Sequence, residues 1–337
     1  MASVPDFMLE GAALITGVRP PPVPARNLVD VGQLDRGSYI GGGDIAALLG
    51  VSPWRTPLDV YLSKIGQAPP ERVDPDRQKR LNRGKRMEPY IVQMLEEDYG
   101  ITITARGHRY RDPEFDFMAA EIDFEWHDDD PRVRNGEIKT VAIMPKQVNP
   151  WGEAGTDEIP IYYAAQSMWG LGITGRETCQ YGTLFGMDNL VLYALQRDDE
   201  TIEQMRETAR AFWMDHVVPR VPPPPKTLGD LAKLWPKERR VSIEATPEIE
   251  AALAKHRELG TTIRVAGEDK DEIDFQIKEF CGDHAEIITK DGVVLATFKA
   301  QDRTSIDSKA LKLELPAVHS KFAHTSTFRV LRHKVKE

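Results

Sequence analysis

The sequence lacks the features of membrane, secreted and disulfide-stabilised proteins. Its two cysteines, Cys179 and Cys281, are too few and too far apart for a disulfide framework or a cysteine-based zinc site. The longest uncharged stretch, Ile159 to Gly175, contains Gln, Ser, Thr and glycines, so it is too polar for a membrane span. No basic segment followed by an apolar one opens the chain, as a secretory signal would. We therefore expect a soluble cytoplasmic protein that makes no membrane contact.

Positive charge is also in short supply. The 337 residues include 44 Lys and Arg against 53 Asp and Glu, which gives a formal charge of −9. This balance argues against loose, non-specific coating of nucleic acid, because phosphate attracts cations. Apolar residues, at 41% of the chain, are sufficient for a packed core and exclude global disorder.

Two proline-rich segments divide the chain. The run Arg19 to Arg26 favours an extended arm, and the run Pro222 to Pro225 cannot continue a helix and predicts a semi-rigid spacer. We therefore predict an N-terminal arm over 1–35, a first domain over 36–221, a linker over 222–226 and a C-terminal domain over 227–337.

Hydrophobic periodicity predicts mixed helices and strands in both domains. In the first domain, helices are expected over 44–49, 57–64, 84–99, 161–171 and 201–216. Strands are expected there over 101–105, 108–111, 119–126, 137–143, 178–185 and 190–195. This pattern indicates an α/β domain with a central mixed sheet flanked by helices. The second domain is predicted to be a smaller α+β unit with helices over 247–265, 271–280 and 308–313 and a hairpin of 285–289 with 293–300.

Glu137 and Lys139 form a candidate catalytic pair. Residues i and i+2 of a strand point to the same face, so an acid able to bind metal would stand beside a cation able to act on a proton or a developing charge. By itself this spacing carries little information, because about three such acid-x-Lys triplets are expected by chance in this composition. Triplets indeed begin at Glu137, Glu268 and Asp307. A solvated strand edge is the alternative for each of them.

Asp123 makes a metal site at Glu137 a specific hypothesis. It lies on the preceding predicted strand, and pairing of the two strands through the intervening loop would bring both carboxylates to one point. Converging carboxylates repel each other unless a proton or a cation joins them. Oxygen ligands without His or Cys suit Mg²⁺ or Mn²⁺. The alternative is a surface hairpin whose acids face water.

Three further features lie near this pair in sequence or pattern. Glu88 shares a helix face with apolar residues, which suggests a partner for its carboxylate, although an acid complementing a helix dipole is the common alternative. Gln166 lies in a mostly apolar helix, where it either orders a water molecule or is a locally satisfied amide. The block 77–86 holds six Lys and Arg and no acid just before Glu88. Such blocks are usually solvated, but this one could place phosphates beside a metal.

Five motifs in this order resemble the YqaJ-type viral recombinase family, the relatives of lambda exonuclease within the PD-(D/E)xK nuclease superfamily. The resemblance spans roughly residues 35 to 215. The motifs are Ile40-Gly-Gly-Gly-Asp-Ile-Ala-Ala-Leu-Leu-Gly-Val-Ser-Pro53, Arg83-Gly-Lys-Arg-Met-Glu88, Ala119-Ala-Glu-Ile-Asp123, Gly136-Glu-Ile-Lys139 and Tyr163-Ala-Ala-Gln166 with Gly172-Ile-Thr-Gly175. It implies a restriction-endonuclease-like core.

The resemblance also implies an activity. It predicts a Mg²⁺-dependent exonuclease, with Mn²⁺ as a substitute ion, that degrades linear double-stranded DNA from 5′ ends. The product would be a 3′ single strand for a single-strand annealing protein in phage-type homologous recombination, inside a bacterial host cell. Lambda-type relatives form ring-shaped trimers, which makes a homotrimer an expectation here.

Site residues follow from the same motifs. Asp123 and Glu137 would bind the metal with the Ile138 carbonyl, and Lys139 would orient or deprotonate the attacking water. Glu88 would complete the metal and water environment, and Gln166 would support the nucleophile. Further matched positions are Asp112, which resembles a second-metal ligand, and the DNA contacts Arg36, Arg80, Arg83, Lys85 and Arg86.

The chain departs from its relatives where the 5′ phosphate is held. Gly43 and Glu121 stand where many relatives have serines, and Ile122 replaces the proline before the metal-binding Asp123. Glu121 would repel a phosphate unless it turns away or binds metal. Two other functions stay open on the same fold: a non-catalytic module that binds DNA ends or a partner, and a structure-specific endonuclease.

Overall fold

The computed structural model describes residues 28–69, 74–142, 150–325 and 327–334, so most of the predicted arm over 1–35 lies outside the described residues. The chain divides into two compact units, Met1–Asp230 and Leu231–Glu337. The division falls after the proline run. Asp230 is fully buried and accepts hydrogen bonds from the Thr56 hydroxyl (2.8 Å) and the Lys226 N–H (2.9 Å), which holds the segment after the prolines on the first unit.

The first unit is built on a five-stranded sheet in the order β1-β2-β3-β4-β5. Its strands are β1 (Thr102–Arg111), β2 (Ala119–His127), β3 (Arg134–Val141), β4 (Thr178–Phe185) and β5 (Asn189–Gln196). Strands β3 and β4 are parallel, and every other neighbouring pair is antiparallel. The predicted α/β class with a central mixed sheet is confirmed.

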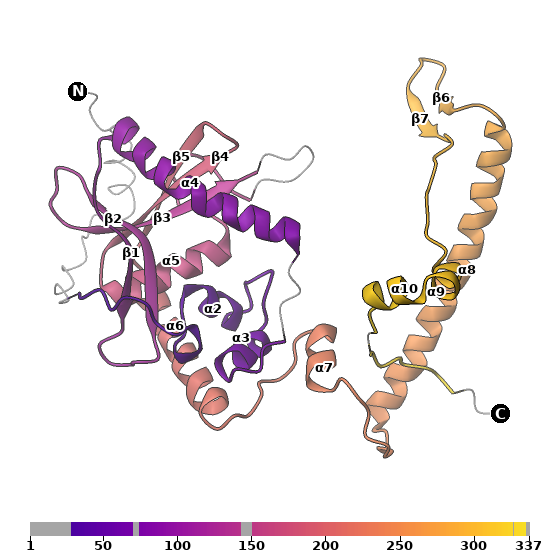
Figure 1. Ribbon diagram of the computed structural model, residues 1–337, viewed down its shortest axis with the longest axis horizontal. Helices are drawn as coiled ribbons and strands as arrows, with labels where there is room; N and C mark the ends of the chain where they lie inside the picture. The colour runs from indigo at the N-terminus through magenta and orange to yellow at the C-terminus, as the bar shows by residue number, and fades with distance from the viewer. Residues whose placement is uncertain (1–27, 70–73, 143–149, 326, 335–337) are drawn as a thin grey trace. The chain divides into compact units, whose positions relative to one another are not determined.

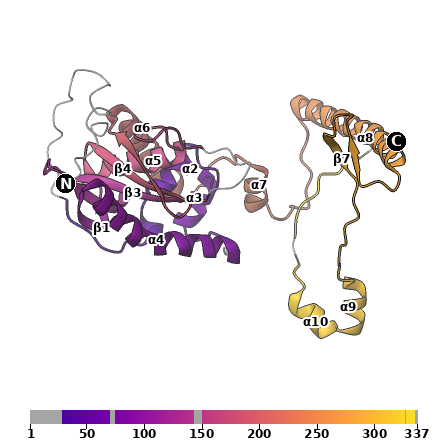
Figure 2. The same ribbon diagram turned by 90° about the horizontal axis from the view of Figure 1, so that it is seen from above.

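Helices cover both faces of this sheet. Helix α4 (Pro75–Tyr99) lies on one side, and α5 (Ile161–Thr174) and α6 (Asp199–Phe212) lie on the other (Figures 1 and 2). Helix α5 occurs in the connection from β3 to β4, because two parallel strands need a crossover. The core under α4 consists of Ile91, Val92, Leu95, Ile101, Phe124, Trp126, Ile138, Leu184 and Leu192.

Shorter helices complete the first unit. They are η1 (Arg36–Ser38), α2 (Gly42–Leu48), α3 (Pro57–Lys64), the π-helical turn η2 (Trp213–Val217) and α7 (Leu228–Leu234), whose last residues belong to the second unit. Helix α2 packs on α5 and α6, and α3 packs on α2 and η1. These contacts bring the Ile40–Pro53 motif next to the helix that carries Gln166.

Three predicted elements in this unit, one helix and two strands, were wrong in extent. Helix α4 begins at Pro75 rather than Gly84, because the Asp74 side chain caps it by accepting the Asp76 N–H (2.9 Å) and proline is favourable in a first turn. The basic block is therefore helical, and Pro89 lies inside the helix. The strands predicted over 101–105 and 108–111 are one strand, β1, with a bulge between Ile103 and Ala105.

Strand β3 pairs with β2 through a very close contact. Gly136 lies opposite Phe124, and a Cβ at Gly136 would come within 2.2 Å of the Phe124 ring. Only glycine leaves room for this ring, so Gly136 sets how closely the two strands that carry Asp123 and Glu137 pack.

The second unit contains α8 (Pro247–Cys281), the hairpin β6 (Glu286–Ile288) and β7 (Val294–Thr297), α9 (Ser308–Glu314) and α10 (Pro316–Phe322). The two helices predicted over 247–265 and 271–280 are one, α8. Ion pairs at helical spacing, Arg264–Glu268 (2.6 Å) and Lys270–Asp274 (3.1 Å), span the polar stretch between them. Helix α10 was not predicted. None of the described helices is long and apolar enough to cross a membrane.

Candidate active site

Glu137 and Lys139 meet on β3, as the strand spacing predicted. The Lys139 ammonium donates a short hydrogen bond to Oε1 of Glu137. Gln166 of α5 donates its side-chain amide to the same Oε1 (2.6 Å). The Glu137 side chain is buried, so the two donors hold one carboxylate in a defined position between β3 and α5.

Asp123 reaches the same point from β2. The antiparallel register pairs Phe124 with Gly136, which puts Asp123 beside Glu137. Oδ2 of Asp123 accepts the Ile138 backbone N–H (3.0 Å). The peptide group of Ile138 therefore lies beside this carboxylate, while the Ile138 side chain is buried in the core under α4.

The nearby carboxylates and the burial of this site change the pKa values of Glu137 and Lys139. Burial, followed by the nearby Asp123 carboxylate, raises the pKa of Glu137 to about 7. Burial alone would lower the pKa of Lys139, but Glu137 and Asp123 outweigh it and keep the lysine charged. The Lys139 ammonium also lies 4.7 Å from the centre of the Tyr163 ring. The site thus combines a fixed cation with a carboxyl group that titrates near neutral pH.

Glu88 approaches from α4. Partial burial and then the charge of Asp123 raise the pKa of Glu88, whereas Lys85 and Lys139 act in the opposite direction. Glu88 is nevertheless exposed. Among the described residues, no three His, Cys, Asp or Glu side chains are close enough to form a ready-made metal cluster.

The predicted DNA-binding residues of α4 lie on the exposed surface of this helix. Arg80 lies 3.9 Å from Asp74, whereas Arg83, Lys85 and Arg86 make no ion pair with the part of the chain that is described. A Cβ at Gly84 would lie 3.7 Å from the Thr140 hydroxyl, next to Lys139 in β3. The basic turn of α4 therefore packs over Thr140, on the face of β3 opposite to the side chains of Glu137 and Lys139.

Asp112 does not join this group. It lies just after β1, where Arg206 of α6 binds its carboxylate and the N–H groups of Glu114 and Phe115 donate to Oδ1 (both 3.0 Å). These contacts tie β1 to α6, and we assign Asp112 this structural role.

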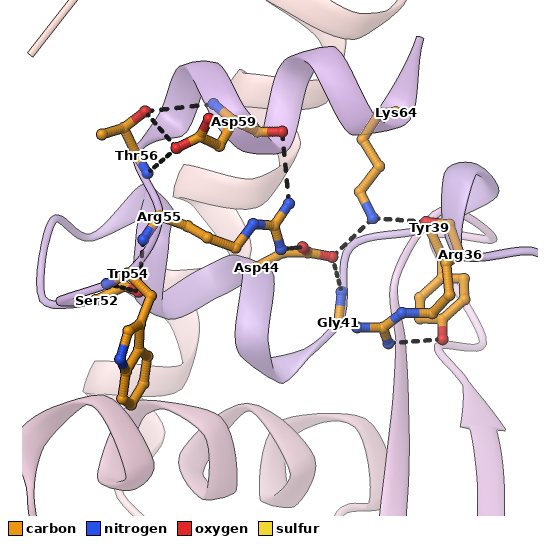
Figure 3. A network of polar contacts seen from close by, with 10 residues as sticks. All are labelled: Arg36, Tyr39, Gly41, Asp44, Ser52, Trp54, Arg55, Thr56, Asp59 and Lys64. Carbon is orange, nitrogen blue, oxygen red and sulfur yellow. Dashed lines mark hydrogen bonds and ion pairs between the residues drawn. The ribbon is translucent and has the colours of Figure 1, made fainter. Parts of the chain in front are cut away.

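Arg36 belongs to a polar network that sequence reasoning missed (Figure 3). Its centre is Asp44, buried at the start of α2, which binds Arg55 (2.6 Å) and Lys64 (2.7 Å). Burial opposes ionisation of Asp44, but Lys64 and Arg55 outweigh it and the pKa of Asp44 falls below its usual value. Lys64 also donates to the Arg36 carbonyl (2.7 Å), and the Arg36 guanidinium donates to the Tyr39 hydroxyl (2.9 Å).

The network fixes α2, α3 and Arg36 relative to one another. A signal for it existed in the sequence: Asp44 follows three glycines at a helix start, where an acid closes a capping box, and it accepts the Gly41 N–H (3.1 Å).

Glu121, the unusual residue two positions before Asp123, has a partner. Arg109 on β1 lies directly opposite Glu121 and binds its carboxylate through two hydrogen bonds (2.6 and 3.1 Å). The negative charge of Glu121 is therefore offset by an arginine. Gly43 faces open space, with no atom within 4 Å of a Cβ built there.

Comparison with known proteins agrees with the resemblance found in the motifs. Residues 33–177 match the model of the YqaJ-like viral recombinase domain. The chain is 26% identical over 312 residues to the protein YqaJ of Bacillus subtilis (strain 168), with 90% of this chain and 93% of that protein covered.

Solved structures with some similarity include two exonucleases. One is an alkaline exonuclease (LHK-Exo) from Laribacter hongkongensis, with 15% identity over 53% of this chain and 88% of that one and a TM-score of 0.38. Another is a phage-related exonuclease from Haemophilus somnus 129PT, with 14% identity over 52% and 91% of the two chains and a TM-score of 0.37. The sequence comparison carries the likeness: residues 33–177 match the YqaJ-like viral recombinase domain.

Proposed function

We propose that this protein is a metal-dependent deoxyribonuclease that degrades linear double-stranded DNA as an exonuclease. The observation that carries the proposal is the meeting of Lys139, Gln166 and Asp123 around the buried Glu137. The match of residues 33–177 to the viral recombinase domain supports a role in recombination. Digestion in the 5′ to 3′ direction, leaving 3′ single strands, is part of the proposal and rests on the family resemblance.

The side chains present can perform most of phosphodiester hydrolysis. Lys139 keeps its positive charge and would stabilise the negative charge that develops on the phosphate. Gln166 holds the carboxylate of Glu137 against rotation, so the acceptor for a water proton is pre-positioned. Arg83, Lys85 and Arg86 would hold the DNA backbone without reading its sequence.

We infer that Asp123 and Glu137 would hold a divalent cation. Burial, and then the charge of Asp123, raises the pKa of both Glu137 and Glu88, and a cation bound beside Asp123 would relieve the repulsion between the carboxylates. Asp123 and Glu137 would hold it, with Glu88 and the Ile138 carbonyl as further oxygen donors, a set suited to Mg²⁺ or Mn²⁺. Such an ion lowers the pKa of a water molecule and offsets phosphate charge.

The wider setting of the activity is also proposed from the family. The substrate would be the end of a DNA duplex, and a single-strand annealing protein would receive the product. The family resemblance further supports a homotrimer acting in the cytoplasm of a bacterial host.

A digestion assay tests the function directly. Linear duplex and covalently closed circular DNA are incubated with the full chain and Mg²⁺, and then with EDTA. We expect loss of the linear DNA alone, and no loss in EDTA. Cutting of the circles would identify an endonuclease, and no cleavage of either would identify a binding module. Duplexes labelled at one 5′ or one 3′ end then give the direction of digestion.

A further inference from the structure

An exposed tryptophan stands beside the candidate active site. Trp54, in the loop between α2 and α3, is 63% exposed. Its ring packs against Tyr162 of α5 with a centroid distance of 4.7 Å and an angle of 75° between the planes. Most of the surface of the indole ring therefore remains open to solvent.

The aromatic contacts continue from Trp54 to the catalytic lysine. The Tyr162 ring packs on Tyr163 (4.5 Å between centroids), and the Trp54 and Tyr163 rings are 6.4 Å apart. The Lys139 ammonium lies 4.7 Å from the centre of the Tyr163 ring. One ring thus separates the exposed indole from the cation proposed to act on the scissile phosphate.

The loop holds Trp54 in place. The Ser52 hydroxyl accepts the backbone N–H groups of Trp54 and Arg55, both at 3.3 Å. Arg55 binds the buried Asp44, and Figure 3 shows the Trp54 ring turned away from this network, toward the α5 side. A side chain ordered in advance loses little conformational entropy when a ligand stacks on it.

We propose that the Trp54 ring, backed by Tyr162, is a stacking surface for a nucleobase of the DNA strand whose phosphate lies at Lys139. Every base has a flat aromatic face, so stacking on tryptophan requires no particular sequence and suits an enzyme that digests any duplex. This inference rests on the proposed function, because it takes DNA as the ligand of the Lys139 site. Its role is to position the strand.

Binding without cleavage tests the proposal. Affinities of full-length wild type, Trp54→Ala and Trp54→Phe are measured by fluorescence anisotropy in Ca²⁺, for a short duplex with intact ends and for one with abasic sites in the terminal nucleotides. We expect Trp54→Ala to weaken binding of the intact duplex roughly 5- to 150-fold, the range of one base–aromatic stack, and Trp54→Phe to weaken it less. On the abasic duplex, wild type and Trp54→Ala should bind equally.

Trp235 supplies the matched control, since it is 52% exposed and lies in the second unit. Trp235→Ala should bind both duplexes as wild type does. Equal weakening of intact and abasic DNA by Trp54→Ala, no weakening of either, or no DNA binding by the wild type would each overturn the proposal.

The two proposals fail separately. If the wild type cleaves linear DNA but Trp54→Ala changes the affinities for intact and abasic duplex equally, the stacking inference alone is wrong. If Trp54→Ala weakens binding of the intact duplex but not of the abasic one, and Mg²⁺ supports no cleavage, the proposed function is wrong. The stacking surface then stands.

Discussion

Gln166 of α5 donates a 2.6 Å hydrogen bond to Oε1 of Glu137 on β3, across the crossover that joins two parallel strands. Its position depends on α2, which packs on α5 at Gly42. A Cβ at Gly42 would lie 2.7 Å from Cγ and 3.0 Å from the backbone oxygen of Gln166. The glycine-rich motif therefore supports the candidate site through backbone contact.

Gly42→Ala should lower the rate of DNA cleavage about ten-fold or more, because it displaces Gln166 and small misplacements are costly in catalysis. It should also lower the free energy of unfolding by about 1 kcal/mol through overpacking. Turnover on linear duplex DNA and the thermal midpoint measure the two effects. Gly260→Ala, in helix α8, is the control: its Cβ meets nothing within 4 Å, so activity should stay within two-fold of wild type. Equal effects of the two substitutions would contradict the assigned contact.

Lys139→Ala and Asp123→Ala should each reduce cleavage of linear duplex DNA at least 100-fold while the fold is kept. Lys139 loses the cation at the scissile phosphate, and Asp123 loses a carboxylate of the proposed cation site. Circular dichroism checks the fold and gel assays check cleavage. Lys309→Ala alters another of the acid-x-Lys triplets, on an exposed helix of the second unit, and should cleave normally. Full activity of Lys139→Ala with Mg²⁺ would remove Lys139 from the site.

Glu137 should make stability depend on pH in the metal-free protein. Its pKa in the folded state is about 7, above its usual value of 4.5, so folding favours the protonated form. This contribution is fully present below pH 4.5 and is lost as the pH rises to about 7. Glu137→Gln stays neutral, so the stability of this variant relative to wild type should rise by about 2–3 kcal/mol between pH 4.5 and 7.5 and then level off. Urea unfolding in EDTA measures it. A difference that is flat across this range would contradict the raised pKa.

Glu121 and Gly43 should set the response to a 5′ phosphate. Arg109 is held by Glu121 in the structure, so Glu121→Ser releases a guanidinium beside Asp123, and Gly43→Ser adds a hydroxyl in open space. We expect the double variant to raise the ratio of cleavage on 5′-phosphorylated over 5′-hydroxyl duplex several-fold relative to wild type. Arg109→Ala added to the double variant should abolish the gain. An unchanged ratio in the double variant would show that this pair lies away from the phosphate.

Local patterns predicted much of the first unit. The residues of α3, the hairpin of β4 and β5, and the pairing of β2 with β3 could be read from periodicity and turn residues, since these contacts join segments close in sequence. The Asp123–Glu137 convergence belongs to this class. The extent of α4 was missed because helix capping by Asp74 and Pro75 outweighed the polar, unperiodic character of the basic block.

Contacts between distant segments were beyond such reasoning. The resemblance matched Asp112 to a second-metal position, but only the tertiary structure pairs its carboxylate with Arg206 of α6. In the same way, Trp54 follows the Ile40–Pro53 motif with no signal of its own, and only folding places it on Tyr162.

Residue types and their spacing were enough to name the residues available for the chemistry, their order along the chain and the domain that residues 33–177 match. Which of these residues come together depends on how the chain folds. The crossover through α5 brought Gln166 and Tyr163 to Glu137 and Lys139, and the buried charge of Asp44 gathered Arg55 and Lys64 around α2. A buried charge or amide without a hydrogen-bonding partner is unfavourable, so folding pairs it with a partner that is close in space. That partner can lie far away in the sequence.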